Sequence, residues 1–168
     1  VREAPQAIDN WWPVAQMALG ASAAPDNYAQ TEPAKSSIEK LRVWFRTNAP
    51  QTLHERGLTL LAHSAIGGIL NDESLKQHVE AIFASQHADG GWSMTDMAPW
   101  QRKDKKPLDP QFTDGYATAF SAYVIARSGS TRDEPRLQKA VQWLKTHQRE
   151  TGGWFTQSPF ARDKIASN

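Results

Sequence analysis

An internal repeat constrains the fold of this 168-residue chain more than any other feature of its sequence. Residues 75–92 align without a gap with residues 137–154, so the two copies are 62 positions apart. The identities are Leu75, Val79, Gln86, Gly90, Gly91 and Trp92, which recur as Leu137, Val141, Gln148, Gly152, Gly153 and Trp154. Matches in register at one offset predict two copies of a single supersecondary unit.

Each copy opens with a predicted amphipathic helix. Between residues 75 and 83, apolar side chains recur at i, i+4, i+7 and i+8, which places them in one stripe. Residues 137–144 repeat this pattern behind the cap, acid and proline signals of residues 133–135. The glycine pairs at 90–91 and 152–153 end both helices and turn the chain.

A second type of helix alternates with the first. Residues 115–127 are apolar nearly all round and rich in alanine, which is typical of a helix buried on every side, and Thr113-Asp114 supplies the N-terminal cap. Residues 58–66 and 11–19 have a similar character, and residues 38–45 form a weaker amphipathic helix. The alternation predicts an all-α fold of helical hairpins, with apolar helices inside amphipathic ones and no sheet.

The second copy resembles the QW motif of squalene-hopene and oxidosqualene cyclases. The first copy is a weaker match, because Ala81 stands where the motif has an aromatic residue. The residues that carry the resemblance are Gln86, Gly90, Trp92, Trp143, Gln148, Gly152 and Trp154. It covers residues 53–168 and extends poorly to the first fifty residues. It implies the terpenoid cyclase/protein prenyltransferase superfamily, and therefore an α/α-toroid of which this chain forms about half a ring.

The motif residues have a structural reading. A Gln amide near the end of a helix can bond backbone groups of the adjoining loop, while the Trp fills the seam between repeats. Trp92 and Trp154 could instead stack on a ligand. We expect residues 1–168 to form a single domain that is truncated at its C-terminal end, because the apolar helix due after Trp154 does not follow before Asn168.

Catalytic machinery of the resembled enzymes is missing from the sequence. Squalene-hopene cyclases use an Asp-x-Asp-Asp cluster as the acid, and no such cluster occurs here. The chain has no cysteine, which breaks the zinc ligand set of prenyltransferases and excludes disulfides and thiol catalysis. We expect no cofactor and no metal, and we expect His63 to be a hydrogen-bonded core or interface residue rather than a ligand.

Three functions remain open after these exclusions. The first is a scaffold, or a module that binds a hydrophobic ligand or partner. The second is a fragment of an isoprenoid cyclase whose catalytic Asp cluster lies outside this chain. The third is a carbohydrate-active toroid, in which two carboxyl groups would face one cleft. The sequence does not decide whether the chain is an enzyme or in which compartment it acts.

A candidate ligand site lies around the start of the helix at 115–127. Asp96, Trp100, Asp114 and Tyr116 are expected near this point, where unpaired N–H groups and the helix dipole favour an anion or a polar head group. Asp96 and Asp114 are also the pair that could serve a carbohydrate-active enzyme. The competing interpretation is that Asp114 caps the helix and Asp96 is a loop acid.

Expected partners follow from charge and from the missing helix. A net charge of +1 gives no electrostatic footprint for nucleic acid, and no apolar stretch is long enough to cross a membrane. The hairpin around residues 134–148 should expose an apolar seam. We expect the remainder of a precursor, a second chain that completes the toroid, or self-association to cover it.

Overall fold

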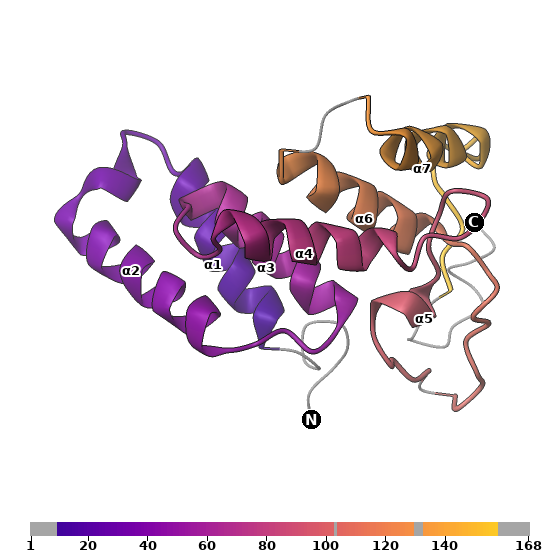
Figure 1. Ribbon diagram of the computed structural model, residues 1–168, viewed down its shortest axis with the longest axis horizontal. Coiled ribbons are helices and arrows are strands. Elements are labelled where there is room, and N and C mark those ends of the chain that lie inside the picture. Colours follow the sequence, from indigo (N-terminus) through magenta and orange to yellow (C-terminus); the bar gives the residue numbers. More distant parts are fainter. Residues whose placement is uncertain (1–9, 103, 130–132, 158–168) are drawn as a thin grey trace.

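The computed structural model describes residues 10–102, 104–129 and 133–157 (Figure 1). Within these ranges every regular element is helical and no strand occurs. The all-α prediction is therefore confirmed. The helices are α1 (Trp11–Ala23), α2 (Glu32–Thr47), α3 (Leu53–Ile66), α4 (Asp72–Phe83), α5 (Met94–Met97), α6 (Gly115–Arg127) and α7 (Pro135–Thr146), with a 3₁₀ turn, η1, at Tyr28–Gln30.

Two of the three apolar helices, α3 and α6, begin at well-formed caps, whereas Asn10 forms no side-chain cap hydrogen bond at the start of α1. Asp114 accepts a hydrogen bond from the N–H of Ala117 at the start of α6, as the sequence predicts. Helix α3 starts with a capping box, in which Thr52 and Glu55 each accept a hydrogen bond from the backbone of the other. This box starts α3 five residues earlier than the apolar pattern alone predicts.

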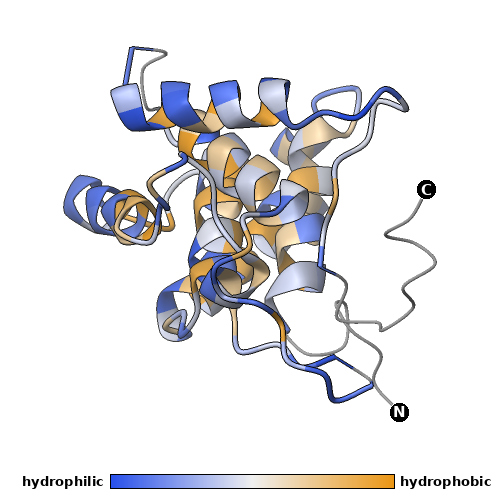
Figure 2. Ribbon diagram, turned by 90° about the vertical axis from the view of Figure 1, so that its right-hand side faces the viewer, coloured by the Kyte–Doolittle hydropathy of each residue, from blue (hydrophilic) through white to orange (hydrophobic). Residues whose placement is uncertain are grey.

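Helices α2, α4 and α7 are amphipathic, and each packs against the apolar helix that precedes it. Figure 2 shows hydrophobic residues concentrated in the middle of the molecule and hydrophilic residues on the outer sides of the peripheral helices. The predicted alternation of helix types is therefore present. Helix α3 packs on both α1 and α6, so the three apolar helices form a row.

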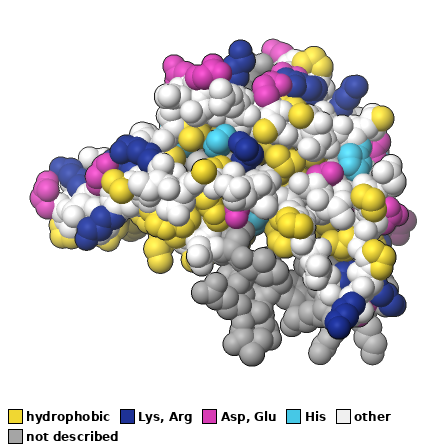
Figure 3. All heavy atoms as spheres, turned by 60° about the horizontal axis from the view of Figure 1, so that its bottom comes forward, with side chains coloured by type: hydrophobic (Ala, Val, Ile, Leu, Met, Phe, Trp, Pro, Cys, Tyr) yellow, Lys and Arg dark blue, Asp and Glu magenta, His cyan; other side chains and the backbone are white. Residues whose placement is uncertain are grey.

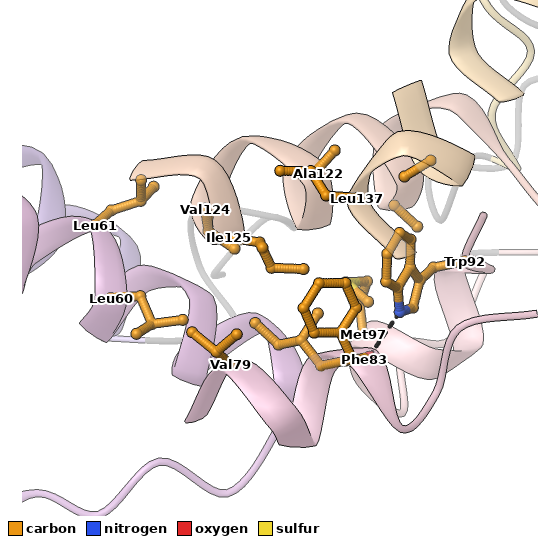
Figure 4. Close-up of a cluster of buried hydrophobic side chains, with 13 residues drawn as sticks. Leu60, Leu61, Val79, Phe83, Trp92, Met97, Ala122, Val124, Ile125 and Leu137 are labelled. Atoms are coloured by element: carbon orange, nitrogen blue, oxygen red, sulfur yellow. Dashed lines mark hydrogen bonds between the residues drawn. The ribbon is translucent and has the colours of Figure 1, made fainter. Parts of the chain in front are cut away.

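Two clusters of buried side chains fill this arrangement. One joins α1, α2 and α3, and the other joins α3, α4, α6 and α7. Figure 4 shows the second cluster, in which Trp92 and Phe83 lie beside Met97 and below Leu137. Burying large apolar side chains from several helices is the main stabilising contribution to such a fold.

The helices at the two ends of the row are not buried on every side. Met17 on α1 is 60% exposed and Tyr123 on α6 is 54% exposed. In contrast, α3 lies between two neighbours and buries eight of its residues. The sequence predicts α6 and α3 to be equally enclosed, and the difference arises because no described helix covers the outer side of α6.

Candidate functional site

The two Gln–Gly–Trp loops have the same internal hydrogen bonds. In the first loop, Gln86 Nε2 donates to the Gly90 carbonyl oxygen at 2.7 Å, and Trp92 Nε1 donates to the Ile82 carbonyl oxygen at 2.8 Å (dashed line in Figure 4). The Trp side chain thus gives a second donor to a carbonyl group in the last turn of α4, which also accepts a hydrogen bond from the Ser85 N–H at 3.2 Å. Gly90 has a φ of 99°, a backbone conformation that favours glycine.

The second loop repeats this geometry at the offset of 62 residues. Gln148 Nε2 donates to the Gly152 carbonyl oxygen at 2.8 Å, and Trp154 Nε1 donates to the Leu144 carbonyl oxygen at 2.7 Å. Gly152 has a φ of 84°. The sequence repeat is thus also a repeat of hydrogen-bond geometry.

The loops differ in what covers them. Gln86 Nε2 also donates to the Arg136 carbonyl oxygen at the start of α7, and a Cβ atom on Gly90 would lie 2.8 Å from the Lys139 backbone. Around Gly152 no described atom lies within 4 Å of the same position. The first loop is therefore packed against the next hairpin, and the second is open.

The two tryptophans reflect this difference. Trp92 is fully buried, whereas Trp154 is 38% exposed. Trp154 thus lies at a partly open surface rather than in the buried seam that the sequence reading gives it. Its Cβ atom still packs closely on α6, because a Cβ atom on Gly115 would overlap it.

Trp143 connects the second copy to the first loop. Its Nε1 donates to Asp89 Oδ2 at 3.1 Å, and its ring stacks on His147 with centroids 4.2 Å apart. Burial alone would raise the pKa of Asp89, but hydrogen bonds from Gly91, Thr113 and Trp143 hold that pKa below its usual value. The Asp89 carboxylate thereby fixes the loop against α7.

The start of α6 is closed by the chain itself. The Gly115 N–H donates to the Phe155 carbonyl oxygen at 2.8 Å, and the Tyr116 N–H donates to Thr156 Oγ1 at 2.9 Å. The Ala117 N–H is bonded to the cap. All three N–H groups are therefore already hydrogen-bonded within the chain. An anion site at this point would need them unpaired.

Asp114 is fully buried at this closed helix start. Burial raises the pKa of its carboxyl group to about 7, although the hydrogen bonds that it accepts oppose the shift. A carboxyl group without exposed surface cannot reach a sugar bound in a cleft. The structure thus gives Asp114 the cap role, so Asp114 is not exposed as one of the two carboxyl groups that a carbohydrate-active enzyme needs.

Asp96 has two roles in the structure. It forms a capping box with Ser93 at the start of the short helix α5, and its Oδ2 lies 3.0 Å from His87 Nε2. The other ring nitrogen of His87, Nδ1, lies 3.0 Å from Thr113 Oγ1. This chain of contacts ties the first loop to the residue before the Asp114 cap, and sequence spacing gave no signal for it.

A cleft of about 300 Å³ opens beside Thr113. Of the four candidate residues, none lines it. The residues that do so are Asp89, Gln111, Phe112, Thr113, Trp143, His147, Arg149 and Phe155. This cleft near the start of α6 is thus lined by the loops and α7 and not by Asp96, Trp100, Asp114 and Tyr116.

Trp100 and Tyr116 do come together, around a histidine. Their ring centroids are 6.5 Å apart, and the Tyr116 hydroxyl lies 3.0 Å from Nε2 of the buried His54. Phe120 and Trp12 complete this aromatic cluster, with centroids 4.9 Å and 6.2 Å from the His54 ring. The cluster joins α1, α3 and α6.

His63 is half-buried and accepts a hydrogen bond from the Leu70 N–H through Nδ1 at 3.0 Å, as expected of a hydrogen-bonded core or interface residue. Among the described residues, no three His, Asp or Glu side chains converge as a metal site requires. No helix in the described part of the chain is sufficiently long and apolar to span a membrane.

An apolar groove of about 730 Å³ lies between α6 and α7 and is here called the α6/α7 groove. Its apolar lining consists of Ala119, Ala122, Tyr123, Ala126, Leu137, Val141 and Leu144. Val141 is 39% exposed, although Val79, 62 residues earlier, is buried. Exposed apolar surface of this kind marks a binding surface or an aggregation risk.

No family model matches this sequence, and no curated protein matches it either.

Proposed function

We propose that this chain is a squalene-cyclase-like repeat module of an α/α-toroid, and that it acts as a scaffold that binds an apolar helix. One observation carries the proposal. The groove between α3 and α4 is filled by α6, and the surface 62 residues later is the open α6/α7 groove. The repeat therefore supports a helix of the α6 type as the partner of this groove.

The details of the filled groove support this reading. Leu61 and Val79 are buried under α6, while their counterparts Tyr123 and Val141 are exposed. Burial of apolar side chains against a partner helix contributes roughly 25 cal/mol per Å² of surface removed from water. The preference for a helix that is rich in alanine follows from the small side chains, Ala119 and Ala122, that line the groove.

The test is a labelled peptide with the sequence of residues 113–129, the helix that fills the equivalent groove. Fluorescence anisotropy at nanomolar chain concentration should show saturable binding to the wild-type chain. Val141→Glu should weaken binding at least about tenfold, because it places an unpaired charge in an apolar contact. Val43→Glu is the matched control, since Val43 is similarly exposed on α2 and does not line the groove. Equal binding to all three proteins, or none at all, contradicts the proposal.

A second candidate, binding of an isoprenoid-like apolar ligand, is favoured by the aromatic cluster around His54. Trp12, Trp100 and Tyr116 are each partly exposed there, and aromatic faces provide large apolar contact area. A titration with farnesol, followed by tryptophan fluorescence, tests it. A saturable change that Trp100→Ala abolishes supports the ligand site, and no change contradicts it.

A further inference from the structure

The row formed by α1, α3 and α6 has an apolar groove at each end. One is the α6/α7 groove. The other, here called the α1/α2 groove, has a volume of about 360 Å³ and is lined by Met17, Gly20, Ala21, Tyr28, Ile38 and Leu41, among others. In Figure 3, hydrophobic side chains follow the lower edge of the left-hand part of the molecule, where α1 and α2 lie in Figure 1, and charged side chains lie above them.

Contacts within the chain show how one hairpin receives the next. Where α6 packs on α3, a Cβ atom on Gly57 would lie 2.5 Å from a ring atom of Phe120. The first helix of a hairpin thus packs closely on the small side chains of the preceding hairpin. Ala119 stands 62 residues after Gly57 and lines the α6/α7 groove, so that groove has the same kind of small-residue floor.

Helix α1 has the features expected of a helix that packs on these small side chains. It is the first helix of its hairpin, and its outward side carries Met17, which is 60% exposed, and Gly20, where an added Cβ atom would meet no described atom within 4 Å. One projecting apolar side chain next to a small residue allows a close approach of two helices. In turn, Tyr123 projects from α6 at the opposite end and is 54% exposed.

We infer that a second copy of this chain places its α1 in the α6/α7 groove, head to tail. The inference rests on the proposed function and names the partner of the same surface. Two copies form two such contacts and close a ring of six hairpins. Contacts between unlike surfaces close into a ring when the rotation between copies allows it. A net charge of +1 per chain opposes the association of two copies only weakly.

A second copy is the occupant that uses both ends at once. Its α1 covers Tyr123 and Val141, and its own α6/α7 groove receives the Met17 side of the first copy. Exposed apolar side chains at both ends are therefore removed from water by one arrangement. Any other single helix covers one end and leaves the other open.

Sedimentation velocity of the chain at micromolar concentration measures the association. We expect a species of twice the 18.7-kDa chain mass, with no larger species. Met17→Glu and Tyr123→Glu, each made alone, should raise the dimer dissociation constant at least about tenfold, because a charge then enters an apolar contact. Val43→Glu should leave the dissociation constant unchanged. Circular dichroism checks that the three variants, all at exposed helix positions, stay folded.

Mixing the two variants tests the head-to-tail arrangement. Met17→Glu keeps its α6/α7 groove, and Tyr123→Glu keeps its α1 surface, so an equimolar mixture retains one intact contact. We expect the mixture to form a heterodimer at concentrations where each variant alone is monomeric. A mixture that stays monomeric indicates a contact between like surfaces and overturns the arrangement.

Two other outcomes also overturn the inference. One is a wild-type monomer at all concentrations, and the other is an open-ended polymer, which shows that the ring does not close. If the chain is monomeric and still binds the peptide of residues 113–129, the second-copy inference fails while the proposed function stands. If the peptide does not bind, the proposed function fails as well.

Discussion

Replacing Trp92 and Trp154 by alanine, one at a time, compares the same loop in a covered and an open position. Trp92 is fully buried, and loss of a buried aromatic ring costs roughly 3–5 kcal/mol. Its Nε1–H also satisfies the Ile82 carbonyl oxygen, which the mutation leaves without this donor. We therefore expect Trp92→Ala to lower the free energy of unfolding by about 4 kcal/mol.

Trp154→Ala should cost about half as much. With 38% of the residue exposed, a smaller apolar area returns to water on unfolding, at roughly 25 cal/mol per Å². Water can also enter the space that the ring leaves, so the cavity contribution is small. We expect a loss of about 2 kcal/mol, which includes the hydrogen bond to the Leu144 carbonyl oxygen, the counterpart of the Trp92–Ile82 bond.

Urea unfolding followed by far-ultraviolet circular dichroism measures both values, at a concentration where the chain is monomeric. Val43→Ala, at an exposed position of α2 outside both loops, serves as the control and should change stability by less than about 0.5 kcal/mol. Equal losses for the two tryptophan variants would refute the reasoning, since they would show that Trp154 is as well covered as Trp92.

Two further predictions concern a carboxyl group and a pair of glycines. The pKa of Asp114 is raised from 3.8 to about 7 in the folded chain. Between these two pH values the folded state therefore binds one proton more than the unfolded state. The free energy of unfolding should fall as pH rises through this window, by up to about 1.4 kcal/mol per pH unit. Asp114→Asn keeps a cap oxygen and should remove this contribution in denaturation curves from pH 4 to 8; parallel curves for both proteins contradict the buried acid. Gly90→Ala should destabilise the chain by at least about 1 kcal/mol more than Gly152→Ala. Both substitutions place alanine at a positive φ, but only the first also brings a Cβ atom against the Lys139 backbone. Equal losses in thermal denaturation would show that α7 moves away from the added methyl group.

The helices were predictable because their signals are local. Apolar spacing places α4 and α7, and the Asp114 cap and Glu134-Pro135 mark two of the helix starts. The short helix α5 and the turn η1 carry too few residues for a periodic pattern. The early start of α3 comes from Thr52 and Glu55, which are polar and lie outside the apolar pattern.

The environment of His54 could not be read from the sequence. Its ring contacts come from Trp12, Trp100 and Phe120, which are distant in sequence and reach it only when three helices and a loop pack together. In the same way, spacing places Asp96 in the loop region but cannot show that it contacts His87. Long-range packing thus decides the surroundings of polar side chains that local patterns place only approximately.

Each Gln–Gly–Trp loop is held by hydrogen bonds within its own repeat copy. This has a consequence for how a chain of such repeats can lengthen. The Gln86–Gly90 and Trp92–Ile82 hydrogen bonds span no more than ten residues, and the Gln148–Gly152 and Trp154–Leu144 bonds reproduce them. A loop that is complete within one copy needs no neighbour to form, even where its surface stays open. Tandem duplication of one 62-residue segment would therefore supply a hairpin that already ends correctly, and only the contacts between hairpins would remain for selection to improve.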